Sequence, residues 1–121
     1  MTAVAVQPFV AVLSGVPLVT EALVDALTGI ADVRVFTNPN GDTVGLLRSL
    51  NPDAIVVDGA EEAESAATYA RRAGVPLLHV CLPERKLRVL DGDGWRDEPA
   101  GLSPEALRNA LAEAIYRRTP E

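Results

Sequence analysis

The residues of this sequence that could do chemistry follow short apolar runs, each near the point where a run ends. They are Ser14, Gly15, Asp58, Gly59 and Cys81. In open α/β sheets, ligands bind in the crevice outside the carboxyl ends of the strands. If the apolar runs are parallel strands, these five residues converge there and form a candidate pocket. The carboxylate, hydroxyl and thiol predict either small-ligand binding or carboxylate chemistry at Asp58.

Each reactive group also has a structural interpretation. Asp58 can cap the turn or helix that follows it by accepting hydrogen bonds from amides near Gly59 and Ala60, and this is the favoured role. Cys81 is the only cysteine in the chain, and a lone cysteine at a strand end is usually a small buried apolar residue. His79 lies inside an apolar run without ligand clusters nearby, which predicts a packed histidine. We therefore expect no catalytic residue, cofactor or metal.

The order of apolar and amphipathic segments predicts a single α/β domain over residues 1–121, with flexible ends at 1–7 and 119–121. The expected strands are 9–13, 33–37, 54–57 and 75–81, and the expected helices are 18–30, 43–50, 61–73 and one that begins at 103–105 and ends near 117–118. Such an alternation implies parallel strands with right-handed crossovers. Where a fourth helix is expected, residues 85–89 instead alternate like a strand and lead into Asp91–Gly94, a turn sequence. A hairpin or an irregular loop is predicted to replace that helix.

Composition narrows the class of protein. The chain has 121 residues, 48% of them hydrophobic, and a net charge of −6. This length suits one domain with a substantial core, and the acidic balance disfavours binding to nucleic acid or to anionic lipid. The N-terminus has neither a signal-peptide pattern nor an apolar run of membrane-spanning length. We expect a cytoplasmic protein whose partners include neither nucleic acid nor membrane.

Two stretches resemble the receiver domain of bacterial response regulators, and the similarity spans nearly the whole chain. Val10–Leu23 resembles the receiver opening, in which an apolar strand meets two acidic residues, followed by Pro-Leu-Val and an amphipathic helix. Pro52–Asp58 resembles the strand whose last aspartate accepts the phosphoryl group. The resemblance implies a flavodoxin-like fold with five parallel strands in the order 2-1-3-4-5 and helices on both faces.

Most positions of the phosphoacceptor site differ from the family. Ser14 and Gly15 stand where receivers have the acidic pair that holds Mg²⁺, and Cys81 stands in place of a serine or threonine. The lysine of the fifth strand has no clear counterpart, although Lys86 is near in sequence. Only Asp58 matches, and phosphoryl transfer without a cation leaves developing charge unneutralised. We therefore expect a pseudo-receiver, in which Asp58 is a vestigial phosphoacceptor.

The resulting functional expectation is a regulatory or protein-interaction module of signal transduction that works without phosphorylation. Two alternatives stay open. One is a receiver that is phosphorylated on Asp58 with the help of an unusual metal site. The other is a flavodoxin-like protein that binds a small ligand or catalyses a reaction in the crevice of Ser14, Asp58 and Cys81.

The segment that replaces the fourth helix supplies a candidate interface. Its members are apolar residues and the single tryptophan of the chain: Leu82, Leu87, Val89, Leu90 and Trp95. This segment corresponds to the receiver surface that often mediates dimerisation, and aromatic side chains are frequent binding hot spots. We expect a protein partner or a homodimer here, with the alternative that Trp95 only covers the sheet edge.

Overall fold

The computed structural model describes residues 8–14, 17–36, 42–81, 84–91, 94–99 and 101–118. The predicted flexible ends, Gly15 and Leu82 lie outside these ranges. The elements in chain order are β1 (Phe9–Leu13), α1 (Pro17–Leu27), β2 (Asp32–Phe36), α2 (Thr43–Leu50), β3 (Ala54–Val57), α3 (Ala60–Ala73), β4 (Leu77–Cys81), β5 (Lys86–Asp91), β6 (Gly94–Asp97) and α4 (Pro104–Arg118). In the described part of the chain, no helix is both long enough and apolar enough to cross a membrane.

The sheet is mixed and six-stranded, with the order β2-β1-β3-β4-β5-β6. Strands β1 to β4 are parallel, as predicted, but β5 runs antiparallel to β4, and β6 antiparallel to β5. The expectation of five parallel strands is therefore wrong. A parallel connection needs about a dozen residues or more, whereas only residues 82–85 separate β4 from β5. The predicted hairpin is confirmed, since Asp91 pairs with Gly94 between β5 and β6.

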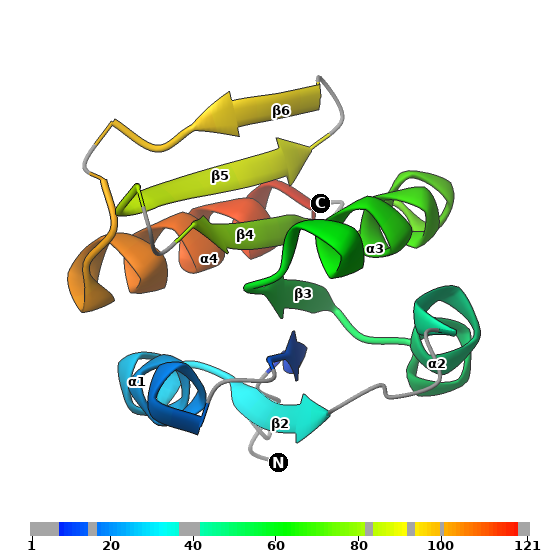
Figure 1. Cartoon of the computed structure of the whole chain (residues 1–121), viewed down its shortest axis with the longest axis horizontal. Helices are drawn as coiled ribbons and strands as arrows, with labels where there is room; N and C mark the ends of the chain where they lie inside the picture. Colours follow the sequence, from blue (N-terminus) through cyan, green and yellow to red (C-terminus); the bar gives the residue numbers. More distant parts are fainter. Residues whose placement is uncertain are drawn as a thin grey trace, which may run out of the picture.

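Helices cover the sheet on both faces (Figure 1). One core cluster joins α1 and α4 to the first face, with Val10, Val56 and Val80 among its strand residues. The other joins α2 and α3 to the second face, with Ala11 and Val57 among its strand residues. Because side chains alternate along a strand, β1 and β3 contribute to both clusters and are apolar throughout. This double burial holds the carboxyl ends of the parallel strands in a fixed arrangement.

The ends of α3 are set by local sequence. Glu61 and Glu62 lie in its first turn and Arg71 and Arg72 in its last turn, an order that complements the helix dipole. Gly74 ends the helix at φ 71°, where glycine has no Cβ penalty, and its amide donates to the Ala70 carbonyl. The predicted stop at Gly74 is confirmed. This helix forms one wall of the groove described below.

Candidate functional site

At the carboxyl edge of the parallel strands, Ser14 and Asp58 are in contact. Leu13 and Val57 are paired across β1 and β3, so the next residue of each strand reaches the same edge. The Ser14 hydroxyl donates a hydrogen bond to Asp58 Oδ2 at 2.8 Å, and Ser14 is only 6% exposed. The sequence prediction that Ser14 and Asp58 converge is confirmed. Asp58 is half-buried, and its carboxylate is hydrogen-bonded to Ser14, which follows the neighbouring strand β1.

The predicted capping role of Asp58 is wrong. Gly59 is the N-cap of α3, in an extended conformation, and this N-cap makes no side-chain capping hydrogen bond. The Asp58 carboxylate instead accepts from the hydroxyl of Ser14, 44 positions earlier in the chain. Asp58 therefore links two strands of the sheet edge rather than closing the turn beside it.

The residues at this edge do not fit the Mg²⁺ site that the receiver resemblance implies. Mg²⁺ prefers oxygen ligands in near-octahedral geometry and is usually held by carboxylates. Ser14 contributes a hydroxyl whose proton points to Asp58. Across the ranges that the structure describes, no three His, Cys, Asp or Glu side chains gather to hold a metal ion.

Cys81 ends β4 and is half-buried, whereas the sequence predicted a buried cysteine. Its Sγ lies 3.5 Å from Nδ1 of His79 on the same strand, and Lys86 pairs with it across the β4–β5 hairpin. Burial, followed by the negative charge of Glu84, raises the pKa of the Cys81 thiol. A raised pKa lowers the thiolate fraction at neutral pH, and the thiolate is the nucleophile. The geometry therefore does not make Cys81 a reactive thiol.

We expect Cys81 to be alkylated by iodoacetamide at neutral pH more slowly than the same cysteine in the urea-unfolded chain, because the raised pKa leaves a smaller thiolate fraction and the folded thiol is partly covered. Mass spectrometry at timed intervals gives both rates. A faster rate in the folded chain would contradict the protonated-thiol interpretation.

His79 lies on β4 with 8% of its surface exposed. Burial lowers its pKa, and the positive charge of Arg88 lowers it further, against the opposing charges of Asp58 and Glu84. The imidazole is thus neutral at neutral pH, as expected for a packed histidine.

The stability of the chain should fall as the pH drops below about 6.5, the ordinary histidine value. The folded state, with the lowered pKa of His79, binds fewer protons than the unfolded state, so acid favours unfolding until the folded histidine also titrates. Urea denaturation across this pH range measures the slope, and His79→Gln should remove this part of it. Because the chain has a single histidine, its NMR titration is unambiguous. A folded pKa at or above the ordinary value would refute the prediction.

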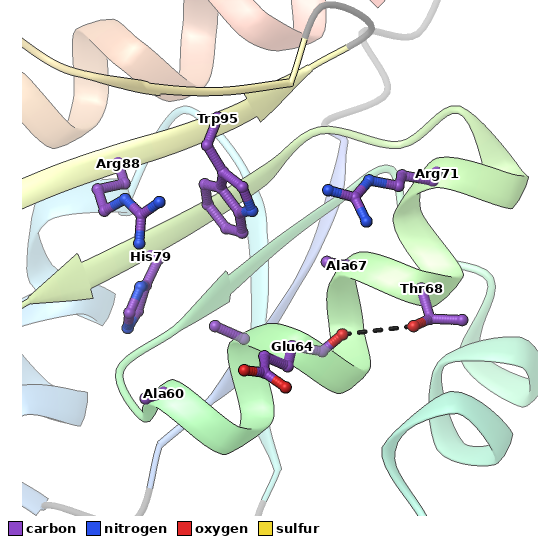
Figure 2. Close-up of a pocket in the computed structure, with 9 residues that line it drawn as sticks. Ala60, Glu64, Ala67, Thr68, Arg71, His79, Arg88 and Trp95 are labelled. Atoms are coloured by element: carbon purple, nitrogen blue, oxygen red, sulfur yellow. Dashed lines mark hydrogen bonds between the residues drawn. The ribbon is translucent and has the colours of Figure 1, made fainter.

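A hollow of about 490 Å³ lies between α3 and strands β4 to β6. We call it the α3 groove. It is lined by Ala60, Ala63, Glu64, Ala67, Thr68, Arg71, His79, Arg88 and Trp95 (Figure 2). The hairpins explain its position, because neither connection between β4, β5 and β6 returns through a helix. The described helix after β6, α4, packs on the other face with α1.

The strand wall of the α3 groove is an organised aromatic and cationic cluster. The Arg88 guanidinium lies 4.7 Å from the centroid of the Trp95 ring, a cation–π distance. Arg88 Nε also lies 3.8 Å from Asp97 Oδ1 across the β5–β6 hairpin. His79 meets Trp95 edge to face, with ring centroids 6.2 Å apart. These contacts orient the half-buried indole beside the groove.

Comparison of the chain with protein-family models, curated proteins and solved structures gives no match.

Most residues of the predicted interface that the structure describes are buried in the core. Leu87 and Val89 are 0% exposed and belong to the core under α1 and α4, and Leu90, at 2%, belongs to the core on the α2 and α3 face. Trp95, by contrast, is half-buried and lines the α3 groove. Of the four candidate interface residues that the structure describes, Trp95 alone retains substantial exposure.

Arg71 and Arg88 were not among the predicted site residues, although both line the α3 groove. A signal for Arg88 exists in the sequence, because it alternates with the apolar Leu87 and Val89 and so faces the opposite side of β5. The arginines come from segments that become neighbours only when β5 returns beside β4.

Proposed function

We propose that this chain is a protein-interaction module of signal transduction that works without phosphorylation, built on a flavodoxin-like, receiver-type sheet. The strand order β2-β1-β3-β4, with helices on both faces, is compatible with that fold. The hydrogen bond from Ser14 to Asp58 is the observation that carries the functional proposal.

Phosphoryl transfer to Asp58 would need a cation that neutralises the charge of the transferred group. Here Asp58 Oδ2 accepts from a buried hydroxyl, at the position where the receiver family has an acidic Mg²⁺ ligand. The edge is thereby stabilised without a cation. The α3 groove, which holds the chain's single tryptophan, is the alternative surface through which the module would act.

The test is incubation with Mg²⁺ and acetyl phosphate, followed by intact-mass measurement before and after acid treatment. We expect no phosphoryl adduct, while an active receiver domain in a parallel reaction is modified. An acid-labile adduct on the wild-type chain that is absent from Asp58→Ala would overturn the proposal and support the phosphoacceptor alternative.

A further inference from the structure

On the second face of the sheet, the structure describes no helix over the α3 groove. On this face α3 contacts α2 along one flank, and its other flank borders the α3 groove. Strand β5 is covered by α4 on the first face. A helix bound in the α3 groove would lie beside α3 on the second face and would cover the strands that carry His79, Arg88 and Trp95.

The length of the α3 groove suits a short helix. Its helix wall extends from Ala60 to Arg71, which is about 16 Å or three turns at 1.5 Å per residue. Ala60, Ala63 and Ala67 have small side chains on this face of α3, and small side chains allow a second helix to approach closely. Trp95 faces this wall from the strands (Figure 2) and offers the kind of aromatic anchor that dominates binding energy.

The charges on the helix wall, combined with the dipole of the bound helix, favour one direction for such a helix. Glu64 and Arg71 both line the α3 groove and are both exposed, two turns apart. Neither forms an ion pair with another described residue. An antiparallel helix would bring its N-terminal half to Arg71 and its C-terminal half to Glu64. A glutamate followed seven residues later by a lysine would then match both charges, and this order also suits the dipole of the bound helix itself. A parallel helix would need the reverse order, which opposes that dipole.

We propose that the α3 groove binds an amphipathic helix of a protein partner, antiparallel to α3, with an acidic residue opposite Arg71, a basic residue opposite Glu64 and an apolar side chain against Trp95. This inference rests on the proposed function, because it names the class of partner that the interaction module takes.

The test uses two synthetic alanine-rich helical peptides of identical composition with blocked ends. One carries the order glutamate, leucine, lysine with the charges seven residues apart, and the other exchanges glutamate and lysine. Because Trp95 is the only tryptophan, its emission reports binding when the peptides lack tryptophan. We expect a saturable blue shift, and about threefold tighter binding of the first peptide, from two exposed ion pairs.

Charge reversal in the protein provides the sharpest control. The double variant Glu64→Arg, Arg71→Glu keeps the net charge and should prefer the second peptide by a similar factor. Arg108→Glu, on the exposed side of α4, should leave the preference unchanged. Trp95→Ala should weaken binding of a fluorescently labelled first peptide about tenfold, as measured by anisotropy. Circular dichroism melts establish that each variant is folded.

Equal affinities for the two peptides, or no change in Trp95 emission with either, would overturn the inference. A concentration-dependent dimer that buries Trp95 in the absence of peptide would also overturn it, because the occupant would then be a second copy of this chain. These results are separate from the phosphorylation test. Failure of peptide binding without phosphorylation of Asp58 refutes only the helical partner, whereas phosphorylation of Asp58 refutes the proposed function itself.

Discussion

Leu87→Ala should lower the free energy of unfolding by about 2 to 5 kcal/mol, the usual cost of a cavity at a fully buried leucine. Leu87 is 0% exposed and packs in the core cluster that contains Leu107 and Leu111 of α4. The truncation removes apolar contacts between β5 and the helix that covers it. Urea denaturation monitored by circular dichroism measures the change.

The matched control is Val35→Ala, because Val35 is an apolar side chain with 38% of its surface exposed on β2. That substitution should change the free energy of unfolding by less than about 1 kcal/mol. If Leu87→Ala instead left the stability unchanged and altered the oligomeric state, Leu87 would be an interface residue, as its sequence context suggested. A loss of stability without a change of oligomeric state supports the core position.

Ser14→Asp should destabilise the chain by about 2 to 4 kcal/mol at neutral pH in EDTA, because two carboxylates about 4 Å apart repel strongly at a partly buried site. The wild-type hydrogen bond between Ser14 and Asp58 is 2.8 Å long, so the new carboxylate would lie beside Asp58. Thermal and urea unfolding measure the loss. Like-charge repulsion raises the folded pKa of the pair, so the destabilisation should shrink as the pH falls toward about 4.

Ser14→Asn is the control for size, since it has the shape of aspartate without its charge, and it should cost only about 1 kcal/mol through the altered hydrogen bond. Excess Mg²⁺ should recover part of the stability of Ser14→Asp and have no effect on Ser14→Asn, because only the paired carboxylates attract a divalent cation. If Ser14→Asp were as stable as the wild type at neutral pH in EDTA, positions 14 and 58 would not face each other.

The site at the sheet edge was partly predictable. Apolar runs ending in Ser14 and Asp58 predicted two neighbouring parallel strands, and parallel strands bring their carboxyl ends to one edge. The partner of Asp58 was not predicted, because a carboxylate at a helix start satisfies a capping rule as well as a contact with the adjacent strand. The choice depended on Ser14 reaching Asp58 Oδ2 from β1.

Local patterns in the sequence were enough to predict the alternation of strands and helices, the stop of α3 at Gly74, and a hairpin or loop in place of the fourth helix. The direction of β5, the burial of Leu87 and Val89, and the α3 groove follow instead from contacts between segments that are distant in sequence. Alternation of apolar and polar residues along a strand indicates that its two faces differ. It does not indicate which strand will be its neighbour or which face a helix will cover. The short β4–β5 connection turns the chain back, so β5 pairs antiparallel to β4 and one of its faces is buried under α4. Its other face leaves Arg88 beside Trp95 and α3, where the α3 groove lies.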